Sequence, residues 1–331
     1  LVNYAFYLGA TNDNLDVIRA LQPGQAAGIK IFMGASTGNM LVDNEETLAG
    51  IFRDAPALIA THCESTPLID ANLAAALEKY GPEIPVTEHP NIRSAEACYV
   101  STVLAQELAR RYSAPLHVLH LSTGREMELF EPGPMADKLI TAEICVHFLH
   151  FDSSHYPSHG NRIKCNPAIK TPADRAALLQ ALKDGRLDII ATDHAPHTAE
   201  EKAATDYRKA PSGLPLVQDA LLSVLELHHD GDLGLEQIVR LTAHNVADRF
   251  KVVDRGYLRE GYWADLVLVD LAAPTAATAD RVLSHCGWTP FEGETFRSSI
   301  ARTIVNGQTV FDGEAIVETD AAQRLEIGSQ R

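Results

Sequence analysis

The sequence predicts an α/β fold of the barrel type followed by a small β-rich domain, and three observations predict it. Six short apolar runs rich in β-branched residues alternate with segments of helical periodicity, which is typical of a parallel sheet with crossover helices. The most unusual polar residues lie at or near the ends of these runs, where barrel proteins carry their sites. The pattern then changes after about Arg255, where short alternating runs and turn signals replace the helices.

The elements follow in order along the chain. The predicted strands are Asn3–Tyr7, Ile29–Met33, Ala57–His62, Leu116–Leu121, Thr141–Phe148 and Leu187–Thr192. The helical patterns lie at about Leu15–Gln22, Glu45–Phe52, Ser94–Arg111, Arg125–Phe130, Ala173–Asp184, Leu216–His228 and Leu235–Phe250. Beyond them, an Asn306-Gly307 turn between two apolar runs predicts a hairpin. We therefore divide the chain into a barrel domain, residues 1–255, and a β-rich domain, residues 256–331.

Composition excludes several classes of protein. The 331 residues carry 28 Lys and Arg against 44 Asp and Glu, a net charge of −16, which argues against binding to a nucleic-acid backbone. A hydrophobic fraction of 46% is enough to fill a core, so a disordered chain is excluded. No apolar run approaches the roughly 18 residues of a membrane span. The five cysteines are scattered and form no C-x-x-C pair, which favours a reducing cytoplasm.

Four residues could carry chemistry. Asp193 directly follows an apolar strand, where a lone carboxylate is expensive to bury unless it is paired or binds a metal. His62 ends another strand, and Lys30 lies inside a third, where an ammonium tends to lose its proton. His120 lies near the end of the Leu116–Leu121 run. Each has an ordinary alternative: a helix-capping aspartate, a hydrogen-bonded core histidine, or a lysine that reaches the strand edge.

His117 and His120 lie three residues apart in the predicted Leu116–Leu121 strand, and this spacing indicates which of them faces the barrel axis. Side chains alternate along a strand, so residues three apart point to opposite faces. We therefore expect His120 to face the barrel axis and His117 to pack against the helices. His194 and His197, in the loop after Asp193, offer imidazoles for an anion. The Gly34–Asn39 loop lacks the Gly-Lys-Ser/Thr of a Walker motif, so phosphate cradling is not expected.

At these residues the sequence resembles the amidohydrolase superfamily, and within it the dihydroorotases. The similar segments are GIKIFMGASTGN around Lys30, THCE around His62, LHVLHLST around His120, IKCNPAIK around Asn166, and TDHAPH at 192–197. The resemblance implies a (β/α)8 barrel in which Lys30 is carboxylated and bridges two zinc ions. It further implies that His62 and His120 bind one zinc, that Asp193 binds the other and shuttles the proton, and that Asn166, His197, Ser212 and Gly213 hold the substrate.

One part of the family's pattern is absent. A His-x-His pair at the end of the first barrel strand occurs nowhere in the sequence, and the chain begins at what resembles the third strand. We therefore expect the first two strands to be missing from the given chain, through truncation of an active enzyme. The alternative is a naturally short homologue that cannot build the first metal site.

The resemblance implies a function. We expect a zinc-dependent dihydroorotase that reversibly cyclises N-carbamoyl-L-aspartate to dihydroorotate in pyrimidine biosynthesis. The alternatives are another cyclic amidohydrolase, an allantoinase or dihydropyrimidinase, and an inactive dihydroorotase-like subunit that scaffolds a partner. The expected partner is the small substrate rather than nucleic acid or membrane, and a homodimer is one expectation for the assembly.

Overall fold

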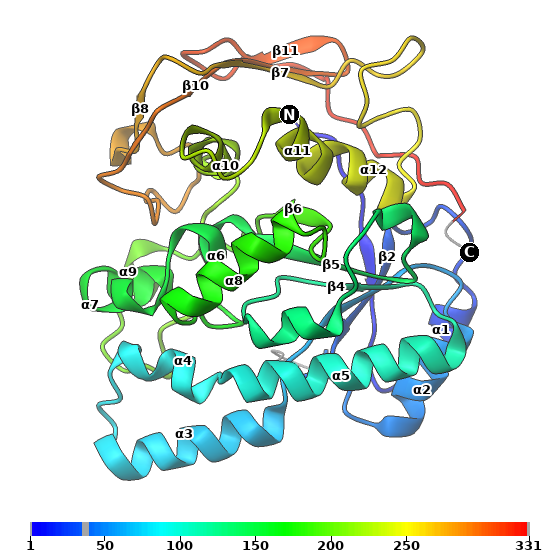
Figure 1. Ribbon diagram of the computed structural model, residues 1–331, viewed down its shortest axis with the longest axis vertical. Coiled ribbons are helices and arrows are strands. Elements are labelled where there is room, and N and C mark those ends of the chain that lie inside the picture. Colours follow the sequence, from blue (N-terminus) through cyan, green and yellow to red (C-terminus); the bar gives the residue numbers. More distant parts are fainter. Residues whose placement is uncertain (1, 35–39, 330–331) are drawn as a thin grey trace.

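The computed structural model describes residues 2–34 and 40–329 and contains a six-stranded parallel sheet (Figure 1). Its strands follow chain order: β1 (Tyr7–Gly9), β2 (Gly28–Phe32), β3 (Ile59–His62), β4 (Leu116–Val118), β5 (Ile140–Cys145) and β6 (Ile189–Ala191). Every neighbouring pair is parallel, as expected for strands joined by crossovers. The six predicted strands are therefore confirmed in number and order, although β1 shares only Tyr7 with the predicted Asn3–Tyr7 strand. Residues 35–39 of the predicted Gly34–Asn39 loop lie outside the described residues.

Helices and helical turns connect the strands and lie outside the sheet (Figure 1). The α-helices are α1 (Leu15–Arg19), α2 (Glu45–Asp54), α3 (Thr66–Tyr80), α4 (His89–Ile92), α5 (Ala95–Tyr112), α6 (Val146–His150), α7 (Tyr156–His159), α8 (Pro172–Lys183), α9 (Ala199–Lys202), α10 (Ala220–His229), α11 (Leu235–Val239) and α12 (Asn245–Phe250). The predicted Arg125–Phe130 helix is a 3₁₀ turn, Arg125–Leu129, and a π-helical turn, Arg240–His244, joins α11 to α12. Among residues 2–34 and 40–329, no helix is long and apolar enough to span a membrane.

Strands β4 and β5 each end three residues earlier than predicted, and β2 and β6 each end one residue earlier. The fifth apolar run continues past Cys145 as α6, and because α6 is buried on nearly every side, its sequence has no polar face to mark the change. The fourth ends at Val118, two residues before His120, whose φ of 40° takes it out of the strand. This early end of β4 changes where the two histidines of that run point.

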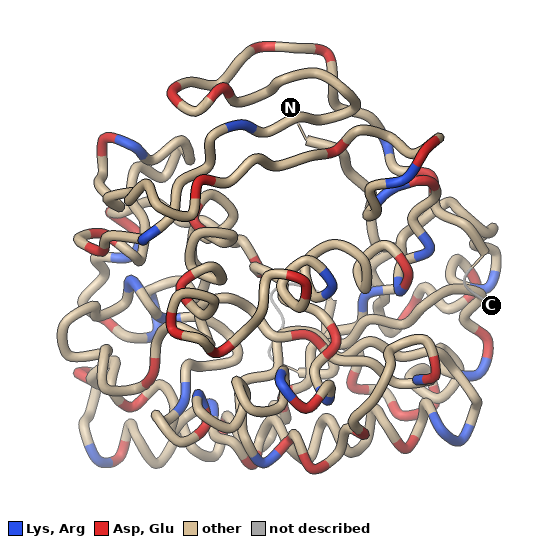
Figure 2. The backbone as a smooth tube through the Cα atoms, turned by 45° about the horizontal axis from the view of Figure 1, so that its top comes forward, with Lys and Arg blue, Asp and Glu red and all other residues tan. Residues whose placement is uncertain are grey.

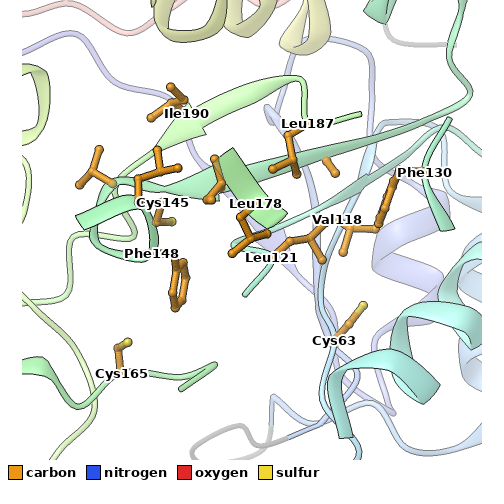
Figure 3. Close-up of a cluster of buried hydrophobic side chains, with 14 of the residues drawn as sticks. Cys63, Val118, Leu121, Phe130, Cys145, Phe148, Cys165, Leu178, Leu187 and Ile190 are labelled. Carbon is orange, nitrogen blue, oxygen red and sulfur yellow. The ribbon is translucent and has the colours of Figure 1, made fainter. Parts of the chain in front are cut away.

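The core lies between the sheet and the surrounding helices. Figure 3 shows part of it, where Val118 and Leu121 lie near Leu178 of α8 and Phe130. All four side chains are at most 3% exposed. This apolar layer fixes the outer face of the strands, so the polar residues of the same strands are left to the inner face.

Beyond the parallel sheet the chain forms two small antiparallel sheets. Strands β7 (Leu266–Asp270), β10 (Ser299–Val305) and β11 (Gln308–Phe311) form one, at the opposite end of the molecule from α3 (Figure 1). Strands β8 (Thr275–Ala276) and β9 (Thr295–Phe296) form the other. The predicted hairpin at Asn306-Gly307 is confirmed, and both residues have the positive φ that such a turn requires. Acidic and basic residues are interspersed along most of the chain (Figure 2).

Candidate metal and substrate site

The predicted residues of the barrel strands come together on the inner face of the sheet. Lys30 of β2 is in register with Ala60 of β3, and Phe32 is in register with His62 at the end of that strand. In a parallel pair, residues in register point to the same face. Lys30 and His62 therefore share a face, with the Phe32 ring 4.4 Å from Lys30 Nζ and 5.5 Å from the His62 ring.

His62 and His120 meet directly. Nδ1 of His62 lies 3.1 Å from Nε2 of His120, and their ring centroids are 4.8 Å apart in an edge-to-face arrangement. Both side chains are buried, and burial lowers the pKa of each imidazole, so both are neutral near pH 7. His120 Nδ1 has no hydrogen-bond partner among the described residues. Two neutral imidazoles that converge in this way are typical metal ligands.

Lys30 provides a buried amine beside them. Burial lowers its pKa to about 8, although the Asp193 and Glu143 carboxylates oppose that shift. A substantial fraction of the amine is therefore neutral in mildly alkaline conditions, which is the state required for any reaction of its nitrogen.

Asp193 lies two residues after the end of β6, with a φ of 48°. It is exposed, unlike the two histidines, but its charge reaches Lys30. The structure therefore places the carboxylate at the same end of the sheet as the lysine and the imidazoles.

The metal-binding capacity of this set depends on the lysine. Among the described residues no group of three or more His, Cys, Asp and Glu side chains is placed to hold a metal ion. His62 supplies its Nδ1 and His120 supplies its Nε2. The other nitrogen of the His120 ring, Nδ1, has no partner among the described residues. The donor set suits zinc if Lys30 supplies a further oxygen ligand after carboxylation.

His117 also faces inward, contrary to the prediction. It is in register with Ala60 and Thr141, bonds Thr141 Oγ1 at 2.8 Å through Nδ1, and lies 3.1 Å from Glu143 through Nε2. The alternation argument failed because β4 ends at Val118, before His120. Glu143 Oε1 in turn accepts a weak bond from the His120 amide, 3.4 Å away.

The predicted substrate residues lie on three loops that contact one another. The Gly213 amide donates to the Lys164 carbonyl, 3.0 Å away, two residues before Asn166. A Cβ on Gly213 would lie 3.2 Å from the His197 ring, so these two residues are adjacent. The Oδ1 atom of Asn166 is buried and finds no partner in the described part of the chain. An unpaired amide oxygen at this position can accept a bond from a ligand.

His194 is engaged elsewhere. Its Nδ1 accepts hydrogen bonds from the Leu216 and Val217 amides, at 2.9 and 3.1 Å. Through Nδ1 it fixes the chain after β6, and the proton of the neutral ring then lies on Nε2. The ring of His197 bonds no backbone amide in the described residues, and its Nδ1 lies 3.7 Å from Glu201 Oε2.

Several residues that support the site were not predicted. Lys202 Nζ donates to the carbonyls of Lys164, Pro211 and Gly213, at 2.9, 2.9 and 3.0 Å. Its side chain is 3% exposed, and burial lowers its pKa to about 7. Lys202 thus ties the Asn166 loop to the loop of Ser212 and Gly213. The sequence did not predict these contacts because they join segments far apart in the chain. Locally, Lys202 is only a lysine in a short polar helix.

Comparison with known proteins matches the profile of the Amidohydrolase family to residues 116–310. This match covers more than half of the chain. The chain belongs to the amidohydrolase family. Its six parallel strands with helices outside them agree with a TIM-barrel fold, as the sequence resemblance implied.

Among curated relatives, this amidohydrolase is 34% identical to a dihydroorotase of Halobacterium salinarum and 32% identical to one of Methanothermobacter thermautotrophicus, each over 88% of the chain. The chain spans 66% and 64% of the length of those two proteins. It is also 27% identical to an allantoinase of Rubrobacter xylanophilus, over 97% of the chain and 72% of the relative.

Solved structures agree on the fold. An L-hydantoinase (dihydropyrimidinase) from Arthrobacter aurescens matches with a TM-score of 0.90 and 25% identity, over 98% of this amidohydrolase and 74% of the other chain. The inactive dihydroorotase-like domain of a Chaetomium thermophilum CAD-like multifunctional protein matches with a TM-score of 0.66 and 19% identity, over 97% and 78%. At 19% identity this match supports a shared fold and nothing more.

Proposed function

We propose that this amidohydrolase is a zinc-dependent dihydroorotase that interconverts N-carbamoyl-L-aspartate and dihydroorotate. The observation that carries the proposal is the convergence of the buried nitrogens of His62 and His120, 3.1 Å apart, on the face that holds Lys30. We take the substrate from the two curated relatives at 34% and 32% identity, both of which are named dihydroorotase.

In this proposal the strand-end residues hold two zinc ions. Lys30, once carboxylated on its amine, would hold both ions, His62 and His120 would bind one, and Asp193 would bind the other. Zinc held by these residues would activate water for attack near neutral pH and polarise the amide carbonyl. The Asp193 carboxylate accepts the proton released in the hydrolytic direction and returns it to the leaving amide nitrogen. Its exposed position after β6 leaves it accessible to a ligand.

The contacting loops hold the substrate. Asn166 offers its unpaired Oδ1 to an N–H of the ring, and the Gly213 loop supplies backbone groups beside Ser212. His197, next to Gly213, faces the substrate carboxylate. The ring of dihydroorotate carries both N–H donors and a carboxylate, so it matches this combination of an acceptor and an imidazole.

A second candidate is an allantoinase. Curated allantoinases of Rubrobacter xylanophilus and Deinococcus radiodurans align with 97% and 98% of this chain, more than the 88% that the first two dihydroorotases align with. Allantoin is also a cyclic amide but lacks the ring carboxylate. The two candidates therefore differ in the group that His197 faces.

A side-by-side assay tests the proposal. The zinc-loaded full-length protein is given dihydroorotate, allantoin and dihydrouracil, and initial rates are compared. We expect dihydroorotate to be turned over fastest, and the Asp193→Asn variant to lose a factor of about 100 or more. Faster turnover of allantoin would favour the second candidate. A folded, zinc-loaded protein that turns over none of the three would contradict both and favour a scaffold role.

A further inference from the structure

Outside the predicted site, Glu64 hydrogen-bonds to His62, and Arg93 hydrogen-bonds to Glu64. We propose that Glu64 and Arg93 act together as positioning residues that orient His62 for metal binding. The inference rests on the zinc site of the proposed function, and neither residue contacts His120 or Lys30 in any hydrogen bond of the described chain.

The contacts form a short chain of hydrogen bonds. His62 Nε2 lies 2.9 Å from Glu64 Oε2, and the Arg93 guanidinium donates to the same carboxylate oxygen. The Glu64 side chain is completely buried and that of Arg93 is 14% exposed. The other oxygen of Glu64 has no partner within the described residues. All of the hydrogen bonding found for this carboxylate is thus directed to His62 and Arg93.

The carboxylate selects one form of the imidazole. An ionised carboxylate only accepts hydrogen bonds, so the proton of the neutral His62 ring must lie on Nε2. The lone pair then lies on Nδ1, the atom that faces His120 at 3.1 Å. Hydrogen bonding of this kind, behind a ligating histidine, fixes the ring and raises its basicity as a ligand.

The backbone holds both partners in place. Glu64 lies two residues after the end of β3, and its carbonyl lies so close to Gly34 that a Cβ on Gly34 would approach within 1.6 Å of the oxygen. Only glycine fits against this carbonyl, so the end of β2 fixes the chain at Glu64. Arg93 lies between α4 and α5, where Asn72 of α3 holds the preceding carbonyl, that of Ile92, at 3.0 Å.

Arg93 reaches the metal site only through the carboxylate. It donates to Glu64 and makes no hydrogen bond to a ring nitrogen of His62. Its planar guanidinium neutralises the carboxylate and restrains its rotation. Removal of Arg93 should therefore matter only while the Glu64 carboxylate is present.

A double-mutant cycle on zinc affinity tests this dependence. Dissociation constants are measured by competition with a chromophoric chelator for the wild type, Glu64→Gln, Arg93→Gln and the double variant. We expect each single change to weaken zinc binding about 10- to 100-fold. The double variant should bind zinc about as well as Glu64→Gln alone. It also buries no unpaired charge, so it remains informative if Arg93→Gln alone does not fold.

The matched control is Arg125→Gln. Arg125 also pairs with a glutamate, Glu96, but both side chains are 49% exposed. We expect its zinc affinity to equal that of the wild type. Unchanged zinc affinity in the folded Glu64→Gln variant, or strictly additive losses in the double variant, would overturn the inference.

A metal-free measurement separates this inference from the proposed function. Nitrogen-15 spectra of labelled histidine report which ring nitrogen of His62 carries the proton. We expect Nε2–H in the metal-free wild type and a mixture of both forms in Glu64→Gln. If the wild type shows this ordered form but binds no zinc, the proposed function fails while the positioning of His62 stands. The same mixture in both proteins would overturn the positioning role.

Discussion

The Nδ1 atom of His62 lies 3.1 Å from the Nε2 atom of His120, although 58 positions separate the two residues. Because His62 Nε2 donates to Glu64, His120 must donate its own proton into His62 Nδ1 when no cation is bound. That leaves the lone pair of His120 Nδ1 buried and without a partner in the described chain. The same two nitrogens, His62 Nδ1 and His120 Nε2, are the ones that would converge on a metal ion bound between the rings.

Replacement of His120 should weaken zinc binding. The His120→Ala variant removes one of two converging ligands, so we expect a loss of about 10-fold or more in zinc affinity and less than the wild-type zinc content. Elemental analysis after dialysis measures the content. His285→Ala is the control, since His285 is exposed. Equal zinc in the wild type and His120→Ala would exclude His120 as a ligand.

The lowered pKa of Lys30 predicts a pH dependence of stability. The folded protein releases this proton at about 8, whereas the ordinary value is 10.5. Between these values the unfolded chain binds more protons, so the free energy of unfolding rises with pH and the cost of burying the ammonium is lost. Below about pH 8 the full cost is present, roughly 3 kcal/mol.

Urea unfolding of metal-free wild type and Lys30→Met measures this effect. The advantage of the variant should shrink by roughly 3 kcal/mol between about pH 7 and pH 11, because other titrating groups cancel in the comparison. A difference that stays constant across this range would show that the Lys30 amine titrates normally in the folded protein.

Loss of the Lys202 ammonium should loosen the substrate loops. In Lys202→Met the Pro211 and Gly213 carbonyls lose the ammonium donor and the Lys164 carbonyl keeps only the Gly213 amide, so we expect a destabilisation of about 2 kcal/mol or more. Amide hydrogen exchange should accelerate over residues 207–214. Lys79→Met, whose side chain is 66% exposed in the wild type, serves as the control. Wild-type exchange in this segment would mean that Lys202 does not hold it.

Gly213 should tolerate no side chain. A Cβ would lie 2.4 Å from the Ala195 carbonyl oxygen, and the φ of +144° disfavours other residues. We expect Gly213→Ala to cost about 2 kcal/mol or more and to weaken dihydroorotate binding. Gly287→Ala is matched, because its φ is also positive at +72° but a Cβ there meets none of the described atoms within 4 Å. Similar thermal stability of the two variants would contradict the close approach.

The sequence predicted the parallel sheet and the strand-end residues because both depend on local patterns. Lys30 interrupts an apolar strand and His62 ends one, and both features are visible in the local sequence without knowledge of the three-dimensional contacts. Helix α3 was missed because, among its 15 residues, only Ile69 and Ala76 are buried, so it has little amphipathic pattern. The orientation of His117 was wrong because the end of β4 depends on the φ of His120.

Long-range contacts account for the rest. Glu64 lies two positions after His62 in the sequence, but its second partner, Arg93, lies 29 positions away. Lys202 reaches the Lys164 carbonyl across 38 positions. No periodicity or motif connects such pairs, since they depend on how the loops fold over the sheet.

Anomalous diffraction at the zinc edge, from crystals of the zinc-loaded full-length protein, tests the central claim most directly. The account predicts a peak within bonding distance of His62 Nδ1 and His120 Nε2, about 2.1 Å from each, with a carboxylated Lys30 beside it. A zinc peak bound elsewhere, with these two nitrogens still in mutual contact, would contradict it.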